Sequence, residues 1–107
     1  MIRFKLVYQS FPDFIRGRVL GSTMIRNGRC VIIIERDLNE AERRHTLKHE
    51  FAHIVLGHFE DSRTDDSDCY LRNLPEIEDE ADRYADQMTD AEFSDLMTYQ
   101  VGEAVFL

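Results

Sequence analysis

The segment 44–58 constrains the fold more than any other part of the chain, because it contains the pattern His49-Glu50-x-x-His53. An α-helix turns by about 100° per residue, so His49 and His53 project within roughly 40° of each other. Two imidazoles one turn apart can bind one metal ion, as they do in zinc hydrolases. Glu50 lies beside them, where its carboxylate can take a proton from a metal-bound water but is poorly placed to bind the metal. The pattern therefore predicts a helical zinc site with Glu50 as the catalytic base.

The flanking residues predict that this segment is a helix of four to five turns. Asn39 and Glu42 form a capping-box pair, which places the first helical residue near Glu40. Gly57 is a good terminator after Leu56. The residues around the second histidine are apolar nearly all round the helix, so we expect the helix to be buried. Buried histidines and a buried carboxylate need partners, and a metal ion supplies them.

A second helix, 76–88, offers the third ligand that a catalytic zinc usually has in addition to a water. Its apolar face consists of Ile77, Ala81, Tyr84, Ala85 and Met88. Glu78 and Asp82 border this face beside the two alanines, where helices can approach closely, and Glu80 borders the opposite side. We therefore expect Glu78 to bind the metal and Asp82 to orient a ligand histidine, with Glu80 as the alternative ligand. The competing interpretation is an acidic, solvated helix without a role at the metal.

The remaining segments predict an α+β fold, in which a small β-sheet packs on the metal-binding helix and the helices that follow it. Residues 2–8 alternate as a strand, with Ile2, Phe4, Leu6 and Tyr8 on one face. Residues 18–25 and 29–35 flank Asn27-Gly28, which favours a type I′ hairpin turn, and the apolar run 30–34 is typical of a strand buried on both faces. After a polar loop, 59–74, and the second helix, we expect a third helix from Asp90 as N-cap to about Gln100. The apolar tail 101–107 is expected to pack back on the core.

Length and composition predict one soluble, cytoplasmic domain spanning residues 1–107. A chain of 107 residues with 43% hydrophobic and 32% charged residues can form a single modest core. It contains no apolar run of the roughly 20 residues that span a bilayer, and no signal-peptide core at its start. The two cysteines, Cys30 and Cys69, form no C-x-x-C pair, so we expect no disulfide. Cys69 is a weak further candidate for the third ligand, because no supporting spacing surrounds it.

The charge is distributed unevenly along the chain. Residues 1–59 carry 10 basic and 6 acidic side chains, whereas residues 60–107 carry 3 basic and 15 acidic ones, giving +4 and −12. The acidic half argues against direct binding of nucleic acid. It favours either a basic protein partner or, equally, solvated faces on the terminal helices.

Residues 31–88 resemble the ImmA/IrrE family of small zinc metallopeptidases. The resemblance rests on Ile33-Ile34-Glu35-Arg36-Asp37-Leu38-Asn39-Glu40, Thr46-Leu47-Lys48-His49-Glu50-Phe51-Ala52-His53, Leu56-Gly57-His58 and Glu78-x-Glu80-Ala81-Asp82-x-Tyr84-Ala85. The spacing from His53 to Gly57-His58 is that of the family and differs from the metzincin pattern. The chain departs from the family after the second helix, where Asp86-Gln87-Met88-Thr89-Asp90 replaces an apolar segment.

This resemblance implies a gluzincin-like fold with a small twisted sheet, an active-site helix and a glutamate on the next helix. It implies that His49, His53 and Glu78 bind zinc, that Glu50 is the general base, and that the substrate is a protein. That protein is often a phage or mobile-element repressor, or another transcriptional regulator. The family has aromatic residues in place of His45 and Tyr84, so we expect both to pack in the core. His58, just past the helix, is expected to cap backbone carbonyls.

The resulting hypothesis is a zinc-dependent endopeptidase in which Glu50 takes a proton from the attacking water and passes it to the leaving amine. The first alternative is a non-catalytic, zinc-stabilised interaction module, which would not need Glu50. The second is a metal-dependent hydrolase acting on nucleic acid, against which the acidic surface and the histidine spacing count. No residue pattern indicates the oxyanion stabiliser, and the sequence leaves the oligomeric state open.

Overall fold

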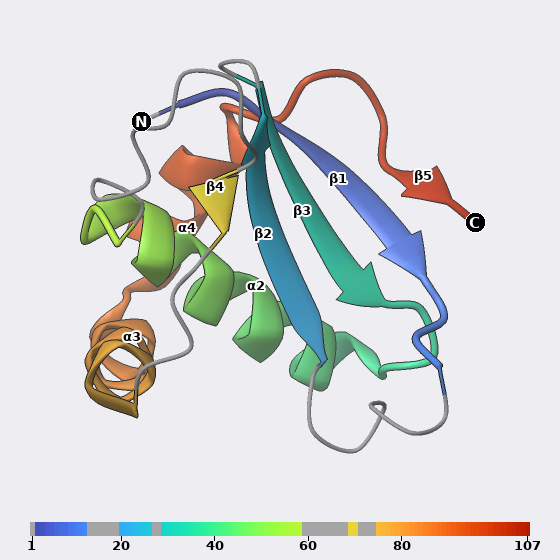
Figure 1. Cartoon of the computed structure of the whole chain (residues 1–107). Coiled ribbons are helices and arrows are strands. Elements are labelled where there is room, and N and C mark those ends of the chain that lie inside the picture. Colours follow the sequence, from blue (N-terminus) through green and yellow to red (C-terminus); the bar gives the residue numbers. More distant parts are fainter. Residues whose placement is uncertain (1, 13–19, 27–28, 59–68, 71–74) are drawn as a thin grey trace.

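The computed structural model describes residues 2–12, 20–26, 29–58, 69–70 and 75–107, and this part of the chain forms one sheet and three helices (Figure 1). In chain order the elements are β1 (Phe4–Gln9), β2 (Gly21–Arg26), β3 (Arg29–Glu35), α2 (Glu40–Val55), β4 (Cys69–Tyr70), α3 (Pro75–Gln87), α4 (Asp90–Met97) and β5 (Val105–Phe106). The predicted α+β class is confirmed. None of the described helices is long and apolar enough to cross a membrane.

The sheet is mixed and has five strands in the order β4-β2-β3-β1-β5. β2 and β3 run antiparallel with Arg26 opposite Arg29, as expected for a hairpin. The predicted turn at Asn27-Gly28 lies outside the described residues. β1 pairs parallel with β3, and β5 pairs parallel with β1. The metal-binding segment thus follows directly from the central strand of the sheet.

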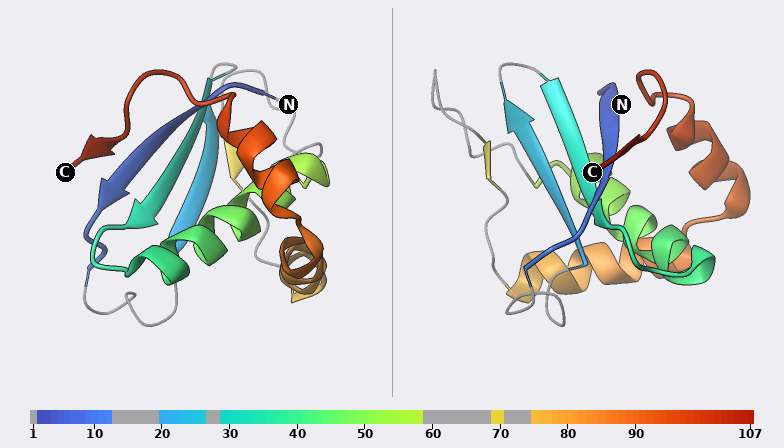
Figure 2. Two further views of the ribbon diagram at one scale, coloured as in Figure 1. Left: turned by 180° about the vertical axis from the view of Figure 1, so that it is seen from behind. Right: turned by 90° about the vertical axis from the view of Figure 1, so that its right-hand side faces the viewer.

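One face of the sheet carries the core, because α2 lies across that face with α4 on the same side (Figures 1 and 2). The inward side chains are Phe4, Leu6 and Tyr8 of β1 and Cys30, Ile32 and Ile34 of β3. They pack against Leu47 and Phe51 of α2, and the Phe4 and Phe51 rings meet edge to face at 5.2 Å between centroids. The expectation that the run 30–34 is buried on both faces was wrong. Val31 and Ile33 remain partly exposed on the face away from the helices.

Helix α2 begins and ends where the sequence indicates. The Asn39 side chain accepts a hydrogen bond from the Glu42 backbone N–H, and the Glu42 side chain accepts one from the Asn39 backbone N–H. At the other end Leu56 is the C-cap, and Gly57 has a φ of 71°, in the left-handed region that favours glycine. The helix is less buried than expected, because the sheet and the other two helices leave part of its surface uncovered. Val55 is 41% exposed, and His45 is exposed rather than packed in the core.

Two helices follow, and their ends correct the sequence-based expectations. α3 packs against α2 with Ala81 and Ala85 buried, and the partly buried Tyr84 contacts the core as expected. The N-cap of α4 is Thr89, whose hydroxyl accepts from the Glu92 backbone N–H, and Asp90 is the first helical residue. A hydroxyl satisfies this donor as well as a carboxylate does. The helix ends at Met97 because the next amides bond to carbonyls three residues back, as in tighter turns.

The apolar tail joins the edge of the sheet. Leu107 N–H donates to the Tyr8 carbonyl at 2.8 Å, and the Phe106 ring stacks on Tyr8. Its side chains are nevertheless largely solvated, since Phe106 is 61% exposed, so the tail packs chiefly through its backbone. Most of the predicted polar loop 59–74 lies outside the described residues. Within it, the structure forms the short strand β4, antiparallel to β2, which the sequence reading did not anticipate.

Candidate metal centre

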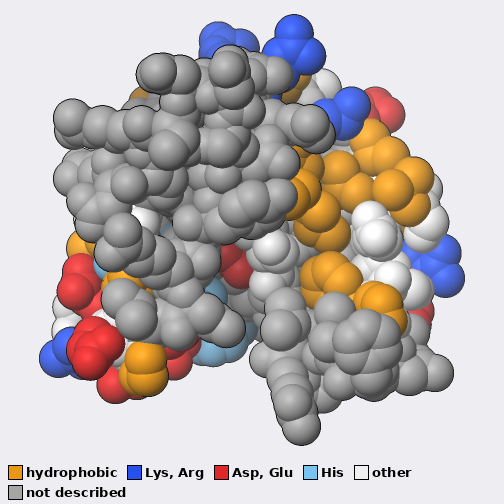
Figure 3. Space-filling model, in the orientation of Figure 1, with side chains coloured by type: hydrophobic (Ala, Val, Ile, Leu, Met, Phe, Trp, Pro, Cys, Tyr) orange, Lys and Arg blue, Asp and Glu red, His pale blue; other side chains and the backbone are white. Residues whose placement is uncertain are grey.

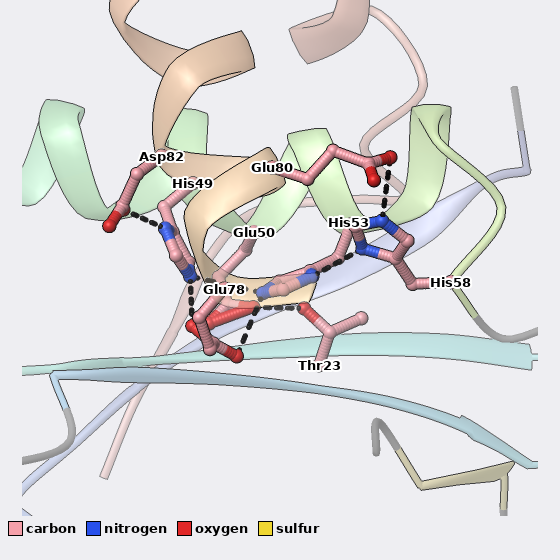
Figure 4. Close-up of polar contacts among 8 residues, drawn as sticks. All are labelled: Thr23, His49, Glu50, His53, His58, Glu78, Glu80 and Asp82. Carbon is pink, nitrogen blue, oxygen red and sulfur yellow. Dashed lines mark hydrogen bonds and ion pairs between the residues drawn. The ribbon is translucent and has the colours of Figure 1, made fainter. Parts of the chain in front are cut away.

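Helix α2 presents its two motif histidines and the glutamate between them at the junction with α3 and β2 (Figure 4). Residues one turn apart share a helix face, so the His49 and His53 rings lie side by side with centroids 4.6 Å apart. The His53 side chain is 1% exposed and that of His49 18%. In the space-filling view, histidine side chains are visible beside acidic ones (Figure 3).

Glu78 of α3 meets both histidines on the side where their Nε2 atoms converge. The two Nε2 atoms are 3.0 Å apart, and the Glu78 carboxylate oxygens lie 2.9 Å from the His49 Nε2 and 3.4 Å from the His53 Nε2. These potential ligand atoms all lie within 4.8 Å of one another. Around tetrahedral zinc, with Zn–N bonds of about 2.0–2.1 Å, two imidazole nitrogens are separated by roughly 3.3 Å. The group therefore comes close to the spacing that a single metal ion of this size requires.

The hydrogen bond of His49 to Asp82 shows why a cation fits this position. Asp82 Oδ1 lies 2.7 Å from the His49 Nδ1, and an ionised carboxylate can only accept, so the Nδ1–H of His49 donates. In the neutral form of this ring the Nε2 carries a lone pair, which faces the Glu78 carboxylate. Two electron-rich groups at 2.9 Å repel each other unless a proton or a metal cation is shared between them. The donor set therefore fits a metal ion.

Burial also keeps the inner histidine in the form that binds metals. Burial, together with the neighbouring rings of His49 and His58, lowers the pKa of His53 to about 3. A neutral imidazole is the form that offers a lone pair to a metal ion. The inner histidine is thus kept ready as a ligand.

The Glu50 side chain lies beside this group of ligands and reaches strand β2 (Figure 4). Its side chain is buried, and its Oε2 accepts a hydrogen bond from the Thr23 hydroxyl at 2.8 Å. Burial raises the pKa of Glu50 to about 7, against the opposing effects of the Thr23 hydrogen bond and His49, while Glu78 adds to the rise. A carboxyl group that titrates near neutrality can both take up and release a proton at that pH. This is the property a general base needs when it also has to return the proton.

Space for the Glu50 carboxylate depends on a glycine at the start of β2. A Cβ at position 21 would lie 3.1 Å from the Glu50 Oε1 and 2.8 Å from the Thr46 Cγ2. Contacts this short force neighbouring atoms to move. Gly21 and Thr23 are two residues apart on one strand, so both face α2, one leaving room for the carboxylate and the other donating to it.

The structure separates the two glutamates that the sequence left as alternatives. Glu78 lies at the histidine pair, whereas the Glu80 Oε1 lies 3.2 Å from the Nε2 of His58. Asp82 contacts a motif histidine, where it was expected. His58 caps a helix carbonyl as expected, because its backbone N–H donates to the His53 carbonyl, but its ring lies at the site, with its Nδ1 2.8 Å from the His53 Nδ1 (Figure 4). The side chain of Cys69 lies outside what the structure describes.

Thr23 and the ring of His58 are the site residues that sequence reasoning missed. Thr23 lies on a strand 27 positions before Glu50, and no local pattern links the two residues. For His58 a signal exists, because Gly57-His58 directly follows the helix. The left-handed glycine reverses the chain there and brings the ring back to His53.

A helix with two histidines and a buried glutamate, completed by a carboxylate from the next helix, is the arrangement of metallopeptidases. A comparison with protein families gives the particular member of this class. The model of the IrrE N-terminal-like domain, peptidase M78, matches residues 6–104, so the chain belongs to this metallopeptidase family. The resemblance found in the sequence is thereby confirmed. Comparisons with curated proteins and with solved structures gave no match.

Proposed function

We propose that this domain is a zinc-dependent endopeptidase that cleaves a regulatory protein, such as the repressor of a phage or mobile element. The observation that carries the proposal is the convergence of the His49, His53 and Glu78 ligand atoms beside the buried Glu50 carboxylate. Family membership supports a protein substrate. The narrower choice of a transcriptional regulator follows from the ImmA/IrrE resemblance.

His49, His53 and Glu78 would hold the metal, and Asp82 would fix the ring of His49 through its Nδ1–H. When bound, zinc supplies a Lewis acid that polarises the scissile carbonyl and makes a water more acidic. The choice of zinc over other divalent ions rests on the donor set, because two imidazoles and one carboxylate are typical of catalytic zinc.

Glu50 would move the proton during cleavage. Its carboxylate takes the proton from the attacking water and delivers it to the nitrogen of the leaving amine, so it is regenerated in each cycle. The Thr23 hydroxyl, which donates to Oε2, holds the carboxylate in place during both transfers. Since burial disfavours the charged form of Glu50, proton uptake from water is promoted.

The same burial weighs against the interaction-module alternative. A domain that only used zinc for stability would gain nothing from a carboxylate that its surroundings destabilise. A peptidase needs such a group. The nucleic-acid hydrolase alternative lacks support, because the helix that supplies Glu78 also carries Glu76, Asp79, Glu80, Asp82 and Asp86. This dense negative charge would repel a phosphate backbone.

The test combines metal analysis with cleavage of a cognate regulator. The wild-type domain should bind about one zinc ion, and His49→Ala or His53→Ala should lose it. Glu50→Gln should keep zinc and fold yet slow cleavage by about 10²- to 10⁴-fold, because the amide cannot accept the proton. Glu40→Gln, an exposed substitution on the same helix, is the matched control and should cleave normally.

The outcomes separate the alternatives. Full zinc content in both histidine variants would place the metal elsewhere in the molecule. Undiminished cleavage by Glu50→Gln would exclude Glu50 as the base. Zinc binding together with tight capture of the intact regulator, without any cleavage by the wild-type domain, would favour the interaction module.

A further inference from the structure

A chain of three side chains leads from the inner metal-facing histidine to the surface. The His53 Nδ1 lies 2.8 Å from the His58 Nδ1, and the His58 Nε2 lies 3.2 Å from the Glu80 Oε1 (Figure 4). The side chain of His58 is only 8% exposed, whereas that of Glu80 is half exposed. Neither His58 nor Glu80 belongs to the group of His49, His53 and Glu78 that could hold the metal. The contacts of His58 and Glu80 therefore need a separate explanation.

The carboxylate at the outer end determines the direction of both hydrogen bonds. An ionised carboxylate has no proton to donate, so the His58 Nε2–H must donate to Glu80. A neutral imidazole with its proton on Nε2 carries a lone pair on Nδ1. The short contact between the two Nδ1 atoms then requires the Nδ1–H of His53 to donate to His58. This leaves the His53 Nε2 without a proton, facing His49 and Glu78.

We propose that His58 and Glu80 are positioning residues that hold His53 in the one tautomer able to bind the metal. This inference rests on the metal site of the proposed function and adds residues to it. Both motif histidines then carry their proton on Nδ1, but they donate it to different partners. His49 donates directly to a carboxylate, whereas His53 donates to a neutral ring that in turn donates to a carboxylate. Partners of this kind set the ring orientation and the basicity of a ligand histidine.

The end of α2 is built to bring the His58 ring to this position. Gly57 adopts a φ of 71°, and the backbone N–H of His58 donates to the His53 carbonyl at 3.1 Å. The chain thus folds back over the last helical turn, and the His58 ring approaches His53 edge-on, with centroids 5.1 Å apart. A capping role alone would need only the backbone of residue 58. Direct metal binding by His58 does not fit either, because both of its ring nitrogens face other partners.

The first experiment reads the tautomers in the intact wild-type domain. Long-range ¹H–¹⁵N correlation spectra of the zinc-loaded, ¹⁵N-labelled protein distinguish imidazoles protonated on Nδ1, on Nε2 or on both. We expect His53 to carry its proton on Nδ1 and His58 to be neutral with its proton on Nε2. A proton on the Nδ1 of His58, alone or in addition to that on Nε2, would overturn the inference.

The second experiment compares two substitutions of nearly equal shape. Asparagine places its Oδ1 as many bonds from Cβ as the Nδ1 of histidine, so His58→Asn keeps an acceptor for the Nδ1–H of His53. Leucine has the same branching without an acceptor. In competition titrations with a chelator, His58→Leu should weaken zinc binding by about 10- to 100-fold. His58→Asn should recover most of that loss, and His45→Asn, at an exposed position of α2, should change nothing.

These measurements separate failure of the inference from failure of the proposed function. If the wild-type domain binds no zinc, the proposed function fails. If the wild-type domain binds zinc and His58→Asn is as weak as His58→Leu, the acceptor at position 58 is irrelevant and only the inference fails. If both variants misfold, the tautomers of His53 and His58 in the wild-type protein still decide whether the inference holds.

Discussion

The two helices that form the site differ in how the rest of the molecule holds them. α2 lies against the sheet, and its site residues alternate with core residues, so that Phe51 and Ala52 are fully buried between Glu50 and His53. α3 buries only Ala81 and Ala85 and holds its carboxylates at its margin, where the Glu78 side chain is 36% exposed.

This difference shows that α2 contributes residues to both the core and the site, whereas α3 contributes mainly to the site. Positions on α2 are fixed by the core before any metal binds. The carboxylates of α3 are placed by two alanines and by their contacts with histidines. Substitutions on α2 should therefore affect stability, and substitutions on α3 should affect metal affinity without a comparable loss of stability.

The largest effect is expected from Phe51→Ala. The Phe51 ring contacts Phe4 of β1 and Phe93 of α4, so its removal leaves a cavity between the sheet and two helices. The free energy of unfolding of the zinc-free domain should fall by about 3–5 kcal/mol. Urea denaturation followed by circular dichroism measures this change. Phe106→Ala, which removes a mostly exposed ring, should cost less than half as much, and equal costs would contradict the proposed role of α2.

The next effect concerns the carboxylates of α3. Glu78→Ala should weaken zinc binding by more than about 100-fold, because it removes a ligand rather than a partner of a ligand. Its stability without zinc should stay within about 0.5 kcal/mol of wild type, as is usual for partly exposed positions. Asp82→Ala should lose about 10- to 100-fold in affinity, and Glu80→Ala less than about 10-fold. Competition titrations rank the three variants, and a loss for Glu80→Ala equal to that for Glu78→Ala would refute the assignment.

The smallest effect is expected where α2 meets α4 at the surface. The Arg44 Nη2 lies 2.7 Å from the Asp90 Oδ1, but both side chains are well exposed. Such pairs contribute about 0–1 kcal/mol, and the Arg44 guanidinium over the Phe93 ring adds a similar small amount. Arg44→Ala should therefore reduce stability by about 1 kcal/mol, with unchanged zinc affinity. A large loss of affinity would show that α4 also helps to hold the site.

The parts of the molecule that the sequence predicts are those encoded by neighbouring residues. The ends of α2 follow from Asn39, Glu42 and Gly57, whose hydrogen bonds or backbone angles involve residues nearby in the chain. The placement of Glu78 beside the histidines, and of Glu80 away from them, follows from helix geometry and from the small residues at 81 and 85. The roles of the predicted ligands and of Glu50 stay predictions until metal and activity are measured.

The parts that the sequence does not predict depend on contacts between distant segments. Thr23 reaches Glu50 only because α2 packs against β2 on the face of the sheet. Strands β4 and β5 have two residues each, too few to show a periodic pattern, and they exist because the neighbouring edges offer unpaired backbone groups. His45 is exposed because it lies on a side of α2 that faces away from the sheet, among other polar side chains.

A substitution of Gly21 could abolish peptide cleavage and leave zinc binding intact. The three atoms nearest to a methyl group at this position belong to Thr46, Glu50 and Ile34, and none of them to His49, His53 or Glu78. A chain of this fold could thus retain every residue of the zinc motif and still lack a working base. When related sequences are sorted into peptidases and inactive homologues, the residue at the start of this strand should be inspected together with the motif.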